Sequence, residues 1–188
     1  TENTSLIPVD NQIRLYFDFV DRHFVLCHRT EPEKSKDKLF WGATAFKDKQ
    51  VFGENKLPLS DNWLKKILTN SNMDSFPLLN KKAITTVTTS MRVLPTQKPV
   101  FYDFRQAGEG FPFDYMQNTL LPTGTPLYIC HISKDRKWIL AESRIAYGWI
   151  PVRDIAWCDE KFCREFETKS LGAIVKDELP VISAGEEF

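Results

Sequence analysis

Three short apolar runs separated by turn residues constrain the fold of this chain more than any other feature. They are residues 127–132, 137–142 and 147–152, and the polar turn Ser133-Lys134-Asp135-Arg136 separates the first two. Strands of this length, rich in aromatic and β-branched residues, are typical of small antiparallel barrels and sandwiches. We therefore predict an antiparallel barrel in which the first two runs form a hairpin.

The middle run predicts a strand that is covered on both of its faces. Alternate residues of a strand point to opposite faces, so Trp138 and Leu140 share one face while Ile139 and Ala141 share the other. Because both faces are apolar, we expect the barrel core on one side and another part of the chain on the other.

Two amphipathic helices are predicted in the first 80 residues. Apolar residues at steps of three and four indicate a helix over Asn11–Cys27, with Ile13 and Phe17 on its apolar stripe. We expect this stripe to pack against the outside of the barrel. A second helix, Asp61–Thr69, follows Ser60, a favourable N-cap residue. Its predicted buried stripe is Trp63, Leu64, Ile67 and Leu68.

The other segments show weaker patterns. Glu31–Lys38 mixes both charge signs and is predicted to be a solvated loop. Leu39–Phe52 is aromatic-rich without a clear period and is predicted to be irregular and partly buried. After the barrel we expect a short helix within Trp157–Phe166 and a strand over Ala173–Ile182.

Composition excludes some classes of partner. The 188-residue chain has zero formal net charge and a pI near 6.8, which argues against nucleic acid or an anionic membrane as the main partner. No apolar stretch reaches the roughly 20 residues of a membrane span. The four cysteines are irregularly spaced and do not indicate a disulfide framework.

An ordered set of short motifs resembles a known family. The set is Phe40-Trp41-Gly42, Gly53-Glu54-Asn55-Lys56, Phe76-Pro77, Arg92-Val93-Leu94-Pro95-Thr96, the insertion Gly108-Glu109-Gly110-Phe111-Pro112-Phe113-Asp114-Tyr115-Met116-Gln117, and Gly148-Trp149-Ile150. Over residues 1–160 it resembles the N-terminal region and first SH3-type module of multidomain NlpC-type cell-wall cysteine peptidases, which cut peptidoglycan stem peptides beside D-glutamate.

The resemblance, together with a change to Thr-, Val- and Ile-rich composition near residue 80, predicts the domain organisation. We expect an α+β chain with a small helical N-terminal region (residues 1–80) packed on a bacterial SH3-like β-barrel with an insertion (81–160). Residues 161–188 would form a linker and the start of a possible second SH3-like module.

The catalytic residues of the family cannot be placed on this chain. Its nucleophile lies in an Asp-Cys-Ser segment, which is not present here, and Cys27, Cys130 and Cys158 lack that context. The chain is therefore predicted to be non-catalytic, and the peptidase domain to be absent from it. His23 and Cys27 with Cys158 and Cys163 lack the close CxxC spacing of structural zinc sites. We predict neither a metal nor a cofactor.

Two residues are candidates for substrate binding. Asp114 either caps a short helix, Tyr115–Asn118, or faces the peptidase cleft and receives a substrate amine. In related enzymes the first SH3 module resembles a wall that selects a free N-terminal L-alanine. Tyr147 either contributes a hydroxyl group to the same wall or packs in the core.

These observations lead to two hypotheses. In the first, the chain is the non-catalytic N-terminal and SH3-like portion of a periplasmic or secreted peptidoglycan γ-D-glutamyl-L-diamino-acid cysteine peptidase. It would shape the substrate groove and select the stem peptide, with a C-terminal peptidase domain as its partner. In the second, it is a stand-alone SH3-like module that binds a cell-wall peptide or a protein.

Overall fold

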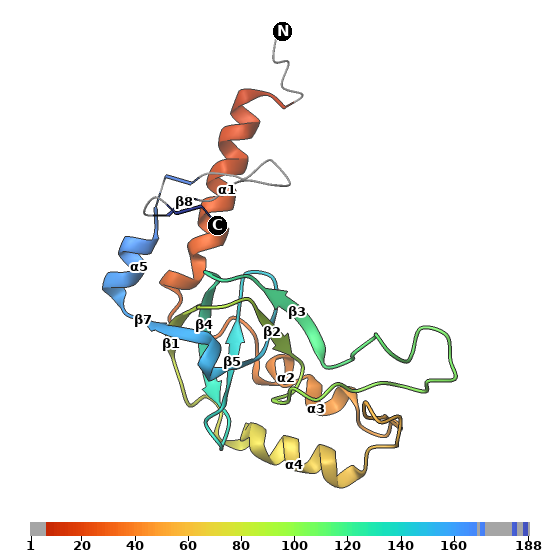
Figure 1. Cartoon of the computed structure of the whole chain (residues 1–188). Helices are drawn as coiled ribbons and strands as arrows, with labels where there is room; N and C mark the ends of the chain where they lie inside the picture. The colour runs from red at the N-terminus through yellow and green to blue at the C-terminus, as the bar shows by residue number, and fades with distance from the viewer. Residues whose placement is uncertain (1–6, 169, 172–181, 184–185, 188) are drawn as a thin grey trace.

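The computed structural model describes residues 7–168, 170–171, 182–183 and 186–187. It is an α+β structure with helices before residue 80 and mainly strands after it, as predicted (Figure 1). The helices are α1 (Val9–His28), α2 (Lys36–Leu39), α3 (Gly42–Ala45), α4 (Asp61–Ser71) and α5 (Glu160–Phe166), with 3-10 turns η1 (Met73–Ser75) and η2 (Val152–Asp154). The strands are β1 (Lys81–Thr85), β2 (Thr89–Arg92), β3 (Gln117–Leu121), β4 (Pro126–Ile132), β5 (Trp138–Glu142), β6 (Tyr147–Pro151), β7 (Ile155–Cys158), β8 (Ile182–Ser183) and β9 (Glu186–Glu187).

Strands β1 to β7 form one antiparallel sheet in the order β3-β2-β6-β5-β4-β1-β7. The hairpin predicted from the first two apolar runs is β4–β5. β3 and β7 end this order without pairing to each other, so the sheet is SH3-like but not a closed barrel. Strand β2 pairs with β6 at one position, Arg92 opposite Trp149, because the chain turns away toward the insertion after Arg92.

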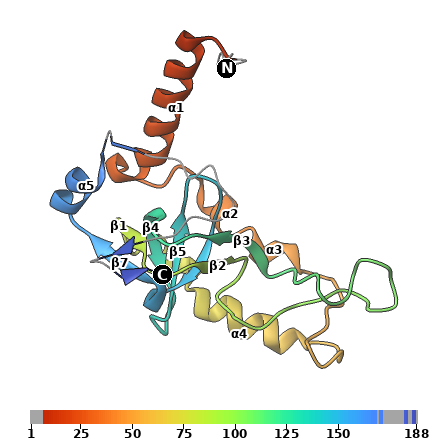
Figure 2. The same cartoon turned by 45° about the horizontal axis from the view of Figure 1, so that its top comes forward.

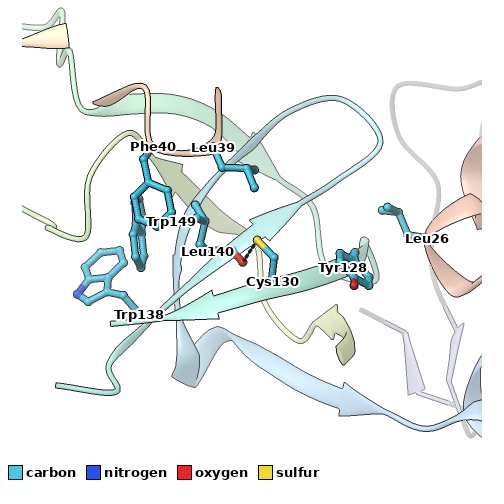
Figure 3. Packing of buried hydrophobic residues seen from close by; sticks show 8 residues of the cluster. All are labelled: Leu26, Leu39, Phe40, Tyr128, Cys130, Trp138, Leu140 and Trp149. Carbon is cyan, nitrogen blue, oxygen red and sulfur yellow. Dashed lines mark hydrogen bonds between the residues drawn. The ribbon is translucent and has the colours of Figure 1, made fainter. Parts of the chain in front are cut away.

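The central strand β5 is buried on both faces, which confirms the prediction from its alternating pattern. Ile139 and Ala141 belong to the core enclosed by the sheet, whereas Trp138 and Leu140 belong to a second cluster on the outer face. The enclosed core is Ala83, Met91, Leu121, Leu127, Ile129, Ile139, Ala141 and Ile150. The outer cluster is Leu26, Leu39, Phe40, Tyr128, Cys130, Trp138, Leu140 and Trp149 (Figure 3).

Helix α1 packs on the sheet only through its C-terminal end. Phe24, Leu26 and Cys27 are buried, whereas Ile13 and Phe17 are 50% and 55% exposed. Figures 1 and 2 both show the N-terminal half of α1 extending away from the sheet. The predicted contact with the outside of the barrel is therefore confirmed for the last turns of α1 and wrong for the rest, because the helix is longer than the surface that covers it.

The segment predicted to be a solvated loop, Glu31–Lys38, is attached to the sheet. The carboxylate of Glu142 in β5 accepts hydrogen bonds from the backbone N–H groups of Glu33 (3.0 Å) and Lys34 (2.9 Å). It also pairs with Arg29 at 2.9 Å, while its own side chain is 3% exposed. The prediction of a solvated loop is therefore wrong at Glu33 and Lys34, whose backbone is hydrogen-bonded to β5.

The remaining predictions fall close to the observed elements. The second helix is α4, and its predicted stripe packs against a buried cluster around Val93 and Val100. Leu39–Phe52 is irregular apart from the four-residue helix α3 and isolated bridges at Phe52. The predicted linking helix begins only at Glu160, where Asp159 accepts a cap bond from the Phe162 N–H. Residues 173–181 of the predicted late strand lie outside the described residues.

His131 joins α4 to the sheet from a buried position in β4. Its Nε2 lies 3.1 Å from the carbonyl oxygens of both Ser71 and Asn72, so it must carry the proton and donate it. Among the described residues Nδ1 has no hydrogen-bond partner. Burial lowers the pKa of His131, and the two carbonyl oxygens only partly oppose this effect.

We expect the neutral form of His131 to make stability depend on pH. Its pKa is below that of the unfolded chain, so the unfolded state binds the proton first as pH falls through about 6.5. The free energy of unfolding should therefore decrease with falling pH, by up to about 1.4 kcal/mol per pH unit. Urea unfolding between about pH 7.5 and 5.5 measures this slope.

The control for this slope removes the other partly buried histidine. Burial, followed by Arg144, lowers the pKa of His23 as well, so the slope is measured in a His23→Gln background. In this background, His131→Gln should reduce the slope of the unfolding free energy against pH. An unchanged slope in the double variant would assign the pH dependence to other groups.

Candidate functional site

Arg92 is a buried cation at the end of β2. Its side chain is 5% exposed and all three of its nitrogens donate. Nη1 bonds Oδ2 of Asp114 at 2.7 Å and Oε1 of Gln117 at 3.0 Å, while Nε and Nη2 bond the carbonyl oxygens of Thr96 and Lys98. Burying a guanidinium group is costly unless it is paired and hydrogen-bonded. Arg92 therefore fixes the path of the insertion that begins after β2.

Asp114 is the partner of this cation and belongs to the insertion. Its Oδ1 accepts backbone hydrogen bonds from Val100 (3.0 Å) and Met116 (2.9 Å), and its side chain is 20% exposed. The predicted helix Tyr115–Asn118 is wrong, since this segment is a turn that leads into β3. Asp114 joins the two ends of the insertion instead of capping a helix.

A depression of about 400 Å³ lies beside this ion pair. Its lining comes from the insertion, from the start of β3, from the residue after β2 and from the α2–α3 turn. It consists of Trp41, Val93, Gly108, Phe113, Asp114, Tyr115, Gln117 and Asn118. Trp41 and Phe113 are 37% and 55% exposed. Gly42 positions Trp41, because a Cβ at Gly42 would lie 2.7 Å from Val93 Cγ1 and from its carbonyl oxygen. Two exposed aromatic rings and one carboxylate therefore line the same depression.

Tyr147, the other predicted site residue, does not line this depression. It is half-buried at the start of β6 and packs against the outer cluster that contains Phe40 and Trp149. Its carbonyl oxygen accepts a 2.7 Å hydrogen bond from Asn118, which does line the depression. The structure therefore connects Tyr147 to the depression through its backbone, and the role of its hydroxyl group stays a prediction.

The pairing of Arg92 with Asp114 was not predicted from the sequence. An available signal was an arginine between two apolar neighbours, Met91 and Val93. Such a residue is expected to be buried and to require a carboxylate. Nothing local to Arg92 indicates which carboxylate it meets.

Asp114→Asn should lower the free energy of unfolding by about 1.5–3 kcal/mol, the range for a hydrogen bond to a charged group. An asparagine that keeps its oxygen toward Val100 and Met116 turns its NH₂ group toward Arg92, where two donors then face each other. Chemical denaturation measures the loss. Gln117→Ala removes an exposed neutral acceptor of the same guanidinium, which water can replace, and it should cost less, about 0.5–1.5 kcal/mol. Equal losses in the two variants would contradict the role assigned to the Asp114 charge.

Two families match the chain. The family described as NLPC_P60 stabilising domain, N term, matches residues 1–76, and the SH3 domain family of the SH3b1 type matches residues 99–151. The chain thus resembles, in sequence order, the N-terminal stabilising domain of NlpC/P60 proteins and an SH3 domain of the SH3b1 type. This confirms the resemblance predicted from the ordered motifs.

A solved structure with a related architecture is described as a novel NlpC/P60 endopeptidase from Photobacterium damselae subsp. piscicida. It is 27% identical to this chain, with a TM-score of 0.77 over 86% of the chain. The match covers 40% of that protein, so this chain spans less than half the length of its relative. Among curated proteins, no sequence matches the chain.

The cysteines are shielded rather than activated. Burial raises the pKa of Cys27 to about 12, with a contribution from Cys163, and it also raises that of Cys130. In the part of the chain that the structure describes, no group of three or more His, Cys, Asp or Glu side chains is arranged to hold a metal ion. Nor does any helix within that part have the length and apolar character to cross a membrane.

Proposed function

We propose that this chain is the non-catalytic N-terminal and SH3-like portion of a peptidoglycan γ-D-glutamyl-L-diamino-acid cysteine peptidase of the cell envelope. It would shape the substrate groove and select the stem peptide for a C-terminal peptidase domain. The observation that carries this proposal is the likeness over 86% of the chain to an NlpC/P60 endopeptidase.

The depression beside Asp114 is the part of the surface best suited to a stem peptide. Such a peptide begins with a free ammonium group next to the methyl group of L-alanine. The exposed edge of the Asp114 carboxylate would attract the ammonium group, and the half-exposed rings of Trp41 and Phe113 would cover the methyl group. Recognition here would need no movement of the Arg92–Asp114 pair.

The thiols support a non-catalytic role. A cysteine nucleophile reacts as the thiolate and is normally found with a lowered pKa. Here burial raises the pKa of Cys158 to about 11 and that of Cys27 to about 12. The chain alone should therefore release no free amine from a stem tripeptide. Cleavage that disappears in Cys27→Ala, Cys130→Ala or Cys158→Ala would contradict the proposal.

Binding of L-alanyl-γ-D-glutamyl-diaminopimelate to the full chain tests the assigned surface. Amide chemical shifts should change around Trp41 and Asp114, and Trp41→Ala should weaken binding about tenfold. Trp157→Ala is the matched control, since Trp157 is 47% exposed on the edge strand β7 and should leave affinity unchanged. No shift changes near the depression at millimolar peptide would exclude this surface as the binding site.

The alternative is a stand-alone SH3-like module that binds a cell-wall peptide or a protein. It shares the peptide-binding expectation but predicts no peptidase partner. The coding sequence downstream of Phe188 separates the two hypotheses. An Asp-Cys-Ser segment followed by a histidine supports the peptidase, and a stop codon supports the stand-alone module.

A further inference from the structure

Three of the four cysteines come together where α1 meets α5, although Cys27 lies more than 130 residues before the other two. Cys27 is in the last turn of α1, Cys163 is in α5, and Cys158 ends β7. Cys27 and Cys163 are 6% and 5% exposed and share a small cluster with Phe24, against which the half-buried Cys158 packs. The fold therefore collects these thiols at one junction.

Cys163 shares this cluster with Cys27 across the contact between α1 and α5. Cys27 and Cys163 are the two buried thiols of this cluster, and both line the same small cavity between α1 and α5. Burial and then the nearby Cys163 raise the pKa of Cys27 and also that of Cys158. The Cys27–Cys163 pair links two helices, whereas a Cys158–Cys163 pair would close only a short loop within one segment.

The α1–α5 junction is otherwise held by a few weak contacts. His28 Nε2 lies 2.9 Å from a carboxylate oxygen of Glu167, and both side chains are well exposed. The rings of Phe24 and Phe166 meet edge to face, with centroids 5.7 Å apart. Figures 1 and 2 both place α5 beside the lower end of α1, while the rest of α1 projects outward. This small contact thus adds to the packing of α1 on β4 and is what joins α5 to α1.

We propose that Cys27 and Cys163 form a disulfide bond that fixes α1 to α5. This goes beyond the proposed function and would operate in an oxidising compartment such as the cell envelope. One thiolate attacks a sulfur of an oxidant disulfide, either glutathione disulfide or the disulfide of a thiol oxidoreductase, and displaces one thiolate from it. The second cysteine thiolate then attacks the protein sulfur of the mixed disulfide, forms the Cys27–Cys163 bond and displaces the remaining oxidant sulfur as a thiolate. Two protons leave the protein and two electrons reduce the oxidant to two thiols.

Incubation of the full chain with glutathione disulfide tests the proposal. Mass spectrometry should show loss of two hydrogen atoms without a glutathione adduct, and peptide mapping should join the peptides of Cys27 and Cys163. The bond would close a loop of more than 100 residues. The oxidised chain should consequently melt on the order of 10 °C above the same chain in dithiothreitol.

Serine variants identify the pair. Cys163→Ser should abolish both the bond and the difference in melting temperature between oxidised and reduced samples. Cys130→Ser should preserve both, since Cys130 lies elsewhere, on β4, with its thiol bonded to the Leu140 carbonyl oxygen. A bond between Cys158 and Cys163, stable mixed disulfides with glutathione, or four free thiols in excess oxidant would each overturn the proposal. None of these outcomes bears on peptide binding at the depression. The disulfide proposal can therefore be wrong while the proposed function is right, and the reverse also holds.

Discussion

Glu142→Ala should lower the free energy of unfolding by about 3–5 kcal/mol, the range for removing one partner of a buried ion pair. The carboxylate is 3% exposed and has three partners: the Arg29 guanidinium and the backbone N–H groups of Glu33 and Lys34. Its removal leaves a cation that is 14% exposed without its buried acceptor, together with two unpartnered donors. Because these partners follow α1 directly, we also expect the segment after that helix to become exposed, which hydrogen exchange would detect.

Glu33→Ala is the matched control for this prediction. Glu33 pairs with the same Arg29 at 2.7 Å, but its side chain is 52% exposed. A solvated pair of this kind contributes no more than about 1 kcal/mol. Chemical denaturation of both variants measures the difference. If Glu142→Ala cost as little as Glu33→Ala, the attachment of this segment to β5 would not contribute to stability.

Trp138→Ala should also cost about 3–5 kcal/mol, as expected for truncation of a large side chain in a packed core. Trp138 is 8% exposed and lies in the outer cluster with Phe40, Leu140 and Trp149 (Figure 3). Removal of the indole ring would leave a cavity between the sheet and the N-terminal region. Since this cluster joins the two regions, we expect a single unfolding transition that shifts as a whole.

Trp157→Ala provides the comparison within the same sheet. Trp157 is 47% exposed on β7, where Lys81 Nζ lies 5.6 Å from its ring centroid. Such an exposed contact contributes about 0.5–1 kcal/mol, so calorimetry should show only a small change in melting temperature. A loss below about 1 kcal/mol for Trp138→Ala would place its ring outside the core and contradict the register of β5.

Which residues share a face was determined by the sequence itself. The alternation in β5 assigned Trp138 and Leu140 to one face and Ile139 and Ala141 to the other, and both clusters exist. Helix α4 likewise follows from its apolar stripe. Ser60 stands at the predicted N-cap position, but its side chain makes no capping hydrogen bond. These predictions succeed because the period of a strand or helix is set by local backbone geometry and by burial of one face.

The partners of the buried charges were decided only by the tertiary structure. Arg29 meets Glu142 113 residues away in sequence, and Arg92 meets Asp114 22 residues away. A charge buried in the fold needs an opposite charge in space, and no local pattern specifies which distant carboxylate supplies it. Whether the sheet closes is also decided by the tertiary structure. Closure would require pairing between β3 and β7, which stand at opposite ends of the strand order. Periodicity predicts which side of an element is covered, and only the packed chain determines what covers it.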